Sequence, residues 1–516
     1  MTWKSNDFSK ERFSFKCKFL CGIFIAALVF LWAAPSMANW AEIKLWDKPI
    51  QFQGLVTQNI AWGLGDECDL DTKSGIQAML YNVLLESYYR PTHNTRATLF
   101  LMLSGDLAYE VLSQDSEWQN KGFDQDRGAL AHDTSFRDVI QECHFQWEPG
   151  TNWYFRVGKQ ILVWGETIGE RIMDQINPSD SRRGISDVEF ETSILPIWLL
   201  RMGYYIQPPE SMLWLNNFGI EFVFNPNAQF EPNRGQAGIW RIVDVDIGPI
   251  PPLGFPGGKL GRQGSLNLKK PAAWDSEGFE YALRFIGSAF GDLNWTINFF
   301  RGIDNSPVTM DAGPPSFSQA YDGTWLLHPN EMGKYPKFRY IGFTLAKPFD
   351  NLNINALGGV GLSTTFEAFY AFDSTFADDT NHRWVEHDEV RWALNLSQAY
   401  KLPWSKYMTD VGVTYVWKKI MDYPDTYKLS AAENAKSANI LMSTAYWHEK
   451  IKPSIFFLRD ISNRGYMFKP TVTYIYTREW NYVLGMLKFG GSKNNAFADI
   501  FKNKNHLFFT VTYQFG

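Results

Sequence analysis

The sequence predicts an all-β fold, an antiparallel β-barrel that crosses a lipid bilayer, and three observations predict it. Apolar and polar residues alternate in segments along the chain that follows an N-terminal leader. The connections between these segments are alternately short and long. Aromatic residues make up 16% of the chain, with 21 Trp and 40 Phe, although no second long apolar run follows the leader. A barrel accounts for all three, because only alternate residues of a lipid-facing strand are apolar and aromatic residues gather at both interfaces.

The last ten residues, His506–Phe515, show the alternation most clearly. One face carries Leu507, Phe509, Val511, Tyr513 and Phe515, and the other carries Phe508, Thr510, Thr512 and Gln514. About 9–11 residues suffice for a tilted strand to cross a bilayer. A lone strand cannot do so, because its backbone N–H and C=O groups would lie unpaired in hydrocarbon. We therefore expect this strand to pair with the first strand and close the barrel.

The N-terminus predicts export. Five basic residues precede the apolar run Phe19–Ala34, and the small-residue site Ser36–Ala38 follows it. This order is typical of a secretory signal peptide, residues 1–38, cleaved after Ala38. A retained signal anchor is the alternative, but the apolar run is short for a membrane span. Residues 39–516 are then a single outer-membrane β-barrel domain, and we expect its long loops to include residues 164–197 and 225–277.

Charge and cysteine content bound the partners. Removal of five basic and two acidic leader residues lowers the net charge from −6 to −9, which argues against nucleic acid as a partner. Cys68 and Cys143 remain after cleavage. Cys143 shares a strand face with Phe145 and Trp147 and is expected to face lipid, whereas Cys68 lies in an acidic loop. A disulfide between them is therefore not expected, although the compartment would permit one.

Eighteen segments have the period of a strand. They are Gln51–Ala61, Ile76–Arg90, Arg96–Glu110, Phe136–Trp147, Trp153–Val163, Trp198–Ile206, Asn217–Phe224, Gly278–Ile286, Leu293–Arg301, Lys337–Ala346, Ile354–Tyr370, His387–Leu396, Asp410–Trp417, Asn439–Trp447, Lys452–Arg459, Tyr466–Thr477, Tyr482–Phe489 and His506–Phe515. Because Ile354–Tyr370 and Lys452–Arg459 have the weakest patterns, sixteen strands is the alternative count. A soluble array of sandwiches would also alternate, but it would not require loops sorted by length.

The connections support a barrel independently of the strands. Short ones such as Pro91–Thr95 and Glu148–Asn152 alternate with long ones such as Val111–Ser135 and Asp373–Glu386. Outer-membrane barrels combine short periplasmic turns with long external loops, and an even strand count leaves both termini in the periplasm. The loop Asn225–Glu277 holds seven Pro and eight Gly, so we expect irregular chain there. It would either plug the lumen or form an external surface.

One motif has a recognisable relative. The fifth strand and its loop read Arg-Val-Gly-Lys-Gln-x-x-x-Trp-Gly-Glu from Arg156 to Glu166, followed by Ile-Asn-Pro-x-Asp from Ile176 and by Leu195-Pro196. This pattern, over about 45 residues, resembles an uncharacterised family of porin-like β-barrels of the Gram-negative outer membrane, often linked with export or uptake of hydrophobic compounds. The resemblance marks Arg156, Gly158, Gln160, Trp164, Gly165, Glu166, Asn177, Pro178, Asp180 and Pro196. The terminal Gly516 departs from the family pattern, in which chains usually end on the aromatic residue.

Strand parity suggests what these residues do. Arg156 and Gln160 share a face with Tyr154, opposite Phe155 and Val157, so we expect them in the lumen, where a charge stays hydrated. Closure of the hairpin through residues 148–152 would set His144 across from Arg156 and Gln146 across from Tyr154.

The loop that follows begins with Trp164 and Glu166 and continues through Asn177 and Asp180. We predict that it folds into the lumen and is tethered near Arg156 and Gln160 through Glu166 and Asp180. A loop in this position narrows the pore, or it is merely pinned to the wall.

No catalytic or metal chemistry stands out. The acidic cluster Asp66–Asp71 has the oxygen ligands of a Ca²⁺ or Mg²⁺ site, but a solvated loop is the commoner reason for such a cluster, so we predict no metal. No haem-attachment motif occurs, and no cofactor is expected. His144 and His387 have no evident Ser partner, so we do not predict an enzyme; an outer-membrane hydrolase is the least favoured reading.

The function predicted from the sequence is an outer-membrane, porin-like channel or transporter for small or hydrophobic solutes, with an inward-folded loop that constricts the pore. The alternative is a structural sheath that holds an export or electron-transfer partner across the membrane. The expected partners are accordingly lipid, a solute and, for the sheath, a periplasmic or export protein.

Overall fold

The computed structural model describes residues 43–64, 75–111, 131–132, 136–167, 171–180, 194–208, 215–232, 246–260, 265–290, 292–319, 325–328, 330–349, 359–403, 405–491 and 504–516. The predicted leader, Cys68 and the acidic cluster Asp66–Asp71 lie outside these residues. No helix within them is long and apolar enough to cross a membrane.

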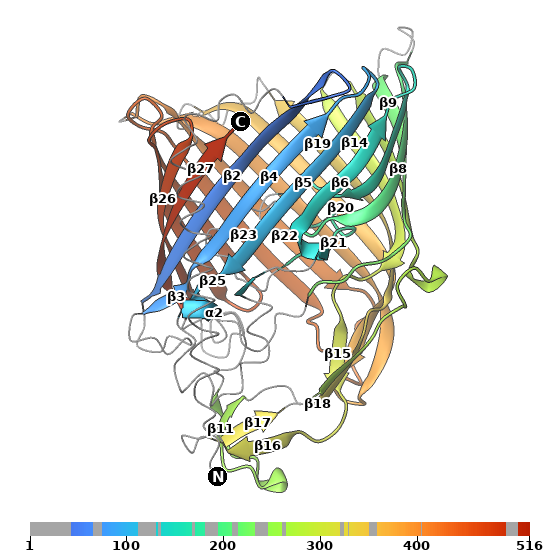
Figure 1. The fold of residues 1–516 in the computed structure, drawn as a ribbon. Helices are drawn as coiled ribbons and strands as arrows, with labels where there is room; N and C mark the ends of the chain where they lie inside the picture. Colours follow the sequence, from blue (N-terminus) through green and yellow to red (C-terminus); the bar gives the residue numbers. More distant parts are fainter. Residues whose placement is uncertain are drawn as a thin grey trace, which may run out of the picture.

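Most of the described strands form one closed antiparallel barrel (Figure 1). Eighteen strands make its wall: β2 (Lys48–Gly63), β4 (Leu80–Tyr89), β5 (Thr95–Asp106), β6 (Ile140–Trp147), β7 (Trp153–Gln160), β8 (Ile197–Ile206), β9 (Leu215–Asn225), β13 (Glu280–Ala289), β14 (Leu293–Ile303), β19 (Lys337–Phe349), β20 (Gly359–Asp378), β21 (Arg383–Lys401), β22 (Met408–Ile420), β23 (Asn434–Ser443), β24 (Ile451–Asp460), β25 (Gly465–Ile475), β26 (Trp480–Gly491) and β27 (His506–Phe515). The predicted count of eighteen is confirmed, and the alternative of sixteen is wrong.

The barrel closes where its last strand meets its first. β27 pairs with β2 over ten residue pairs, from Gly54 opposite Phe515 to Gly63 opposite His506. The inward faces of this seam are polar: Asn59 Nδ2 donates to Thr510 Oγ1 at 2.8 Å, and the hydroxyls of Thr57 and Thr512 lie 3.3 Å apart. Closure leaves no free edge in the wall, as the terminal strand required.

Exposure alternates along each strand as the predicted parity requires. On β14, Ile297 and Phe299 are exposed whereas Thr296, Asn298 and Phe300 are buried. The same pattern holds on β27, where Leu507 is exposed and Phe508 is buried. The apolar sets therefore point outward and the polar sets inward.

The two rims differ in the length of their connections. The C-terminus and the start of β2 lie at the rim of the short turns (Figure 1). Most connections at the other rim are long, with two exceptions. The predicted long loop Asp373–Glu386 is wrong, because β20 and β21 continue through it to a tight turn between Asp378 and Arg383. The turn from Ile461 to Arg464 is also short.

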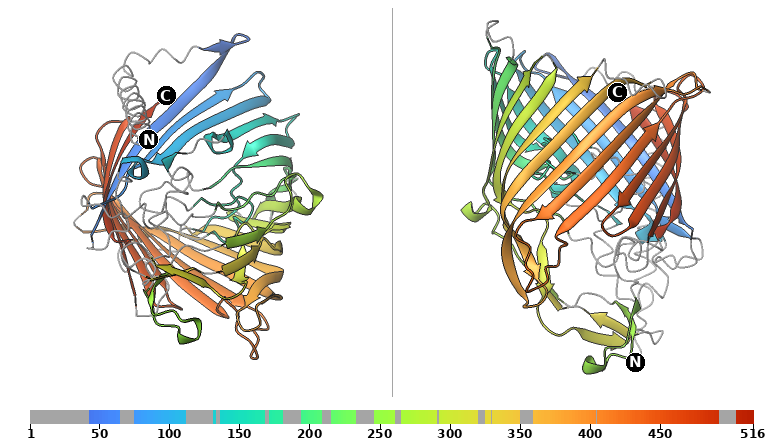
Figure 2. Two further views of the ribbon diagram at one scale, coloured as in Figure 1. Left: turned by 60° about the horizontal axis from the view of Figure 1, so that its bottom comes forward. Right: turned by 180° about the vertical axis from the view of Figure 1, so that it is seen from behind.

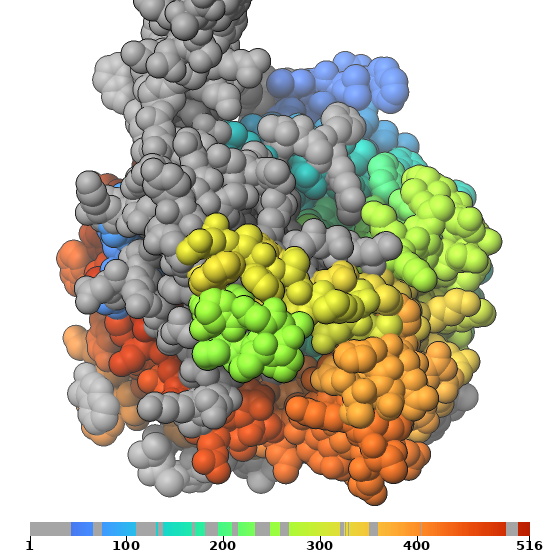
Figure 3. Space-filling model, turned by 90° about the horizontal axis from the view of Figure 1, so that it is seen from below, coloured from blue at the N-terminus to red at the C-terminus, as the bar shows by residue number. Residues whose placement is uncertain are grey.

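Short elements extend the barrel beyond the long-loop rim. They are β10 (Asp246–Ile247), β11 (Gly258–Leu260), β12 (Ser265–Lys269), β15 (Val308–Asp311), β16 (Ser316–Gln319), β17 (Trp325–His328) and β18 (Asn330–Lys334), with the single 3₁₀ turns η2 (Pro251–Leu253) and η3 (Ser276–Gly278). β11 pairs with β17 and β12 with β18, both in parallel. Seen from that end, these segments lie over part of the barrel mouth (Figure 3).

The Pro-rich loop Asn225–Glu277 therefore contains regular structure that its composition did not predict. Its described part contributes β10, β11 and β12 to the small sheets beyond the rim of the long loops (Figure 2). Four further short elements border the wall: β1 (Lys44–Leu45), β3 (Ile76–Ala78) and the one-turn helices α2 (Ala108–Val111) and α5 (Phe136–Val139). α5 takes the place of the first four residues of the strand that was predicted to begin at Phe136.

The seam gives a direct test of register. In a chain with Cys68→Ser and Cys143→Ser, the pair Thr57→Cys and Thr512→Cys should form a disulfide, because these side chains meet across the seam. The oxidised barrel should migrate differently from the reduced one on a denaturing gel. The control pair, Thr57→Cys with Thr510→Cys, is two residues out of register and should not cross-link. Cross-linking of the control pair alone would contradict the seam.

Candidate functional site

The loop after β7 turns inward and packs against the inner wall. We call its residues 161–180, described except for 168–170, the inward segment. Its apolar side chains join one buried cluster with wall residues that extend from β8 to β22. The cluster comprises Leu162, Trp164, Ile172, Met173 and Ile176 of the segment and Ile197, Leu199, Val223, Ala282, Phe300, Phe338, Tyr340, Phe369, Ala371, Ala393 and Val416 of the wall. The segment thus lies across the inner face of at least a third of the barrel.

A carboxylate shapes the bend of the inward segment. Asp174 Oδ1 accepts the backbone N–H of Trp164 at 2.5 Å and that of Gly165 at 2.8 Å. A Cβ atom at Gly165 would lie 2.8 Å from Asp174 Oδ2, so only glycine leaves room for this carboxylate. The Trp-Gly pair of the motif therefore forms a backbone cradle for Asp174. Asp174 lies between the first two parts of the motif, and its role was not predicted.

An amide joins the two ends of the loop. Asn177 Oδ1 accepts the N–H of Leu162 at 2.9 Å, and its Nδ2 donates to the carbonyl of Leu195 at 2.8 Å and to that of Gln160 at 3.4 Å. Asn177 is 1% exposed. Gln160 is itself fully buried and donates to the carbonyl of Leu199 on β8 at 3.2 Å. These bonds hold the loop where it leaves and rejoins the wall.

Further contacts fix the middle of the inward segment to distant strands. The Glu166 N–H donates to Glu367 on β20, and Tyr340 on β19 donates to the carbonyl of Met173 at 3.2 Å. Arg284 on β13 lies over the Trp164 ring at 5.6 Å. Burial lowers the pKa of the Arg171 guanidinium, which the nearby Asp174 opposes. The segment is therefore held by backbone and aromatic contacts as much as by charge.

Arg156 lies in a polar row on the wall itself. Arg96, Gln146, Arg156 and Arg201 are direct neighbours across β5, β6, β7 and β8. Arg156 Nη2 donates to Gln146 Oε1 at 2.8 Å, and Arg201 Nε donates to Glu221 Oε1 at 2.8 Å. The Arg156 guanidinium thus bonds a neighbour on the wall instead of Glu166 or Asp180, the partners that the sequence suggested.

The predicted pairing of β6 with β7 is wrong by two residues. His144 lies opposite Gly158, and Gln146 lies opposite Arg156. Trp153 and Tyr154 pair with β8 before β7 meets β6, so the turn is longer than predicted. A Cβ at Gly158 would lie 2.2 Å from the Cys143 carbonyl, which explains the glycine. His144 is buried and its Nε2 lies 3.1 Å from Glu142 Oε2.

A second loop also packs inward, which the sequence analysis missed. Ala108 and Tyr109 of α2, together with Ala131, join a buried cluster with Ala61, Ala78, Leu80, Leu487, Phe489 and Phe508 of the neighbouring strands. Tyr81 Oη lies 2.8 Å from His132 Nδ1. The first inward segment packs on a different part of the wall, so the lumen is lined by loops on two sides.

Two further histidine contacts involve hydroxyl groups. His387 Nε2 lies 3.2 Å from Tyr427 Oη. Ser318 Oγ lies 2.7 Å from His328 Nε2, a contact that was not predicted, on the exposed sheet outside the barrel. No group of three or more His, Cys, Asp or Glu that could hold a metal ion occurs among the residues that the structure describes.

Comparisons with known proteins do not assign a family. No protein-family model and no curated protein matches the chain. Solved structures similar to it include Pseudomonas aeruginosa OccK8 (OprE), with 9% identity over 90% of this chain and 98% of that one and a TM-score of 0.46. Acinetobacter baumannii OccAB1 has 10% identity over 92% and 98%, with a TM-score of 0.45.

A complex of Salmonella typhi OmpF with daunomycin has 10% identity over 91% and 98%, with a TM-score of 0.39. The class that the strand pairing itself defines is a closed, eighteen-stranded antiparallel barrel with inward-packed loops.

The cradle around Asp174 can be tested by amide exchange. Asp174→Ala removes the acceptor of two buried N–H groups, and bonds to a charged acceptor each contribute about 1.5–3 kcal/mol. Amides of residues 162–166 should therefore exchange at least about tenfold faster, while amides of the wall strands stay protected. Asp174→Asn is the matched control, because its carbonyl oxygen can still accept both bonds. Equal exchange in Asp174→Ala and the wild type would show that the cradle does not hold the segment.

Proposed function

We propose that the protein is an outer-membrane channel for small solutes whose lumen is narrowed by the inward segment. The observation that carries this proposal is the packing of the described residues of the inward segment against the inner wall of a closed barrel. Val163 and Glu166 are exposed on this segment and border the remaining space. The short-turn rim, with both ends of the barrel chain, is periplasmic in this proposal, and the long-loop rim is external.

The outer surface of the barrel favours a bilayer. Five large apolar side chains on the adjacent strands β14 and β19 are all 38–39% exposed: Ile297, Phe299, Ile341, Phe343 and Leu345. At the short-turn rim, aromatic rings pair in a band: Trp153 with Phe155 at 5.7 Å, Trp480 with Tyr513 at 4.8 Å and Trp447 with Tyr474 at 6.1 Å between centroids. An apolar belt bordered by aromatic rings is the surface that lipid solvates.

The inward loops favour a channel over a structural sheath. A sheath needs a lumen that its own loops leave open for a partner protein. Here the inward segment and the contacts of α2 occupy the wall on two sides. The polar row from Arg96 to Arg201 then gives the remaining space a field of fixed charge, which is how pores select among small ions and polar solutes.

Lipid contact should make the outer face intolerant of charge. Ile297→Arg is expected to destabilise the barrel by about 2–4 kcal/mol, because the guanidinium would lie in hydrocarbon. Thr473→Arg, on the half-buried inward face of β25, is the matched control and should cost little. Denaturant unfolding from lipid vesicles measures both. Similar losses for the two variants would mean that the outer face does not contact lipid.

The polar row should set ion selectivity. In planar bilayers, Arg156→Ala should shift the reversal potential towards cation selectivity, because a fixed positive charge leaves the lumen. Folding should survive, since the interior of such barrels tolerates polar change. Arg339→Ala is the control: its side chain is exposed and pairs with Asp373, and strand parity places it on the outer face, so selectivity should not change. Unchanged selectivity in Arg156→Ala would show that the polar row has a structural role only. A wild-type protein without conductance would contradict the channel.

A further inference from the structure

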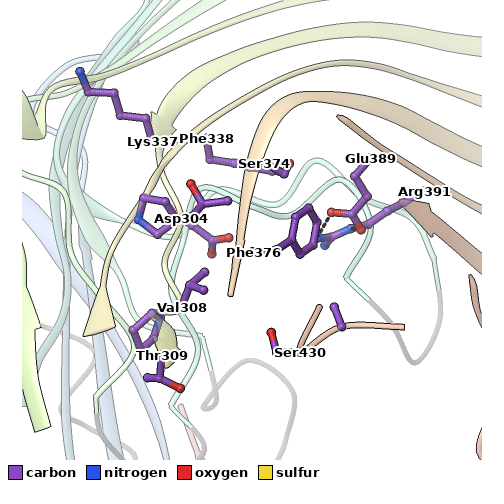
Figure 4. Close-up of a pocket in the computed structure, with 14 residues that line it drawn as sticks. Asp304, Val308, Thr309, Lys337, Phe338, Ser374, Phe376, Glu389, Arg391 and Ser430 are labelled. Atoms are coloured by element: carbon purple, nitrogen blue, oxygen red, sulfur yellow. Dashed lines mark hydrogen bonds and ion pairs between the residues drawn. The ribbon is translucent and has the colours of Figure 1, made fainter. Parts of the chain in front are cut away.

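A cavity of about 310 Å³ lies at the long-loop rim, beside the inward segment. Five parts of the chain line it: the connection after β14 (Asp304 to Thr309), the start of β19 (Pro336 to Phe338), β20 (Ser374 to Phe376), β21 (Glu389 and Arg391) and the connection after β22 (Ser430 and Ala431). Its volume is at the lower end of the range of ligand pockets, about 300–1,000 Å³. Figure 4 shows these side chains around the cavity.

The cavity contains a carboxylate with unused acceptor capacity. Asp304 is held in place by its own N–H, which donates to the Pro336 carbonyl at 2.8 Å, and its Oδ1 accepts the N–H of Ser306 at 2.9 Å. Its second oxygen has no hydrogen-bond partner among the described residues. Burial raises the pKa of this carboxyl, and the N–H of Ser306 and the charge of Arg391 oppose that rise only in part. A donor placed in the cavity would meet this oxygen.

A buried hydroxyl is a second group in the cavity that could bond a ligand. Ser374 on β20 is 6% exposed and lines the cavity, and its Oγ has no hydrogen-bond partner among the described residues. A hydroxyl buried without a partner costs free energy, so a ligand atom that bonds it would recover that cost. The second carboxylate oxygen of Asp304 and the Oγ of Ser374 could therefore both bond a ligand in this cavity.

The cations of the cavity do not meet Asp304. Arg391 forms a two-pronged ion pair with Glu389, its neighbour on the same strand face, in which Nη2 lies 2.8 Å from Oε2. The ammonium of Lys337 points away from Asp304 in Figure 4. The charge of Arg391 acts on Asp304 against the negative charges of Glu231 and Glu389, but Arg391 is already paired with Glu389. The local field thus favours a cationic guest over an anionic one.

The rest of the lining is apolar. Phe376 lies between Asp304 and the Glu389–Arg391 pair in Figure 4, and its ring is half-buried. Pro307, Val308 and Phe338 complete this apolar lining. An aromatic face beside a carboxylate attracts an ammonium group, through the ring quadrupole as well as through the charge.

We propose that this cavity binds a small solute that carries an amine cation on an apolar or aromatic body. The amine would donate to Asp304 and to Ser374 Oγ, and the body would pack on Phe376 and its apolar neighbours. The idea that a solute binds here as it enters a channel rests on the function proposed above. Binding to the cavity does not depend on that function. Asn305, next to Asp304, donates to the Gln175 carbonyl at 2.7 Å, so the site adjoins the inward segment.

Calorimetry on the purified full-length protein in detergent tests the proposal, with phenethylamine as the probe. Phenethylamine should bind, and phenylacetate and 2-phenylethanol, which have the same ring without the cation, should bind at least about tenfold more weakly. Asp304→Asn keeps the acceptor for Ser306 and should weaken phenethylamine binding about tenfold or more. Ser374→Ala should weaken it by a smaller factor. Asp311→Asn removes an exposed carboxylate outside the cavity and should bind phenethylamine as the wild type does.

Three results would overturn the proposal: no binding of phenethylamine to the wild type, equal binding of 2-phenylethanol, or undiminished binding in Asp304→Asn. Conductance in planar bilayers separates this failure from failure of the channel. A protein that conducts but does not bind phenethylamine contradicts the site alone. A protein that binds phenethylamine but does not conduct contradicts the channel alone.

Discussion

Pairing of every backbone N–H and C=O in the wall is the constraint on which the rest of the structure depends. A strand that crosses hydrocarbon gains nothing from water, so its polar groups must bond to neighbours on both sides. The pairing of β27 with β2 meets this demand by removing the last two edges. Once the wall is closed, side chains alternate along each strand between the outer face, toward lipid, and the inner face, toward the lumen. Polar residues such as Asn59 and Thr510 then have a place inside, bonded to each other across the seam.

The eighteen-stranded wall encloses a lumen, and loops of the chain pack against its inner face. The chain lines it with its own loops, which bring their own polar backbone inside. Asp174 and Asn177 satisfy that backbone with side-chain oxygens and nitrogens, while Ile172, Met173 and Ile176 bury apolar surface against the wall. The motif that stands out in the sequence is thus explained largely by loop anchoring. A solute that entered the lumen would meet the exposed side chains of the anchored loop and the polar row beside it.

The wall could be predicted from the sequence because alternation is a local property. The terminal strand and the weak segment near Ile354–Tyr370 both proved to be wall strands, and parity placed Arg156 and Ile297 on opposite faces. Register could not be predicted in the same way, since it depends on where a hairpin turn closes. The slip of two residues between β6 and β7 kept every face correct and changed every partner.

Contacts between segments distant in sequence could not be predicted from the alternation of apolar and polar residues. Nothing local indicates that the Glu166 N–H reaches Glu367, or that a Pro-rich loop adds parallel strands to β17 and β18. Charge suggested that Arg156 would hold the loop through carboxylates, but a nearer amide, Gln146, takes its hydrogen bonds. The cavity beside Asp304 likewise needs five segments, and no one of them reveals it alone.

The most direct test of a channel narrowed by its own loop is the size of solute that it admits. Liposomes that contain the purified protein can be challenged with uncharged sugars of increasing mass, and their swelling rates compared between the wild type and Asp174→Ala. The account predicts that the wild type admits small sugars only, and that release of the inward segment raises the size limit. Liposomes that admit no sugar, or an identical limit in both proteins, would contradict it.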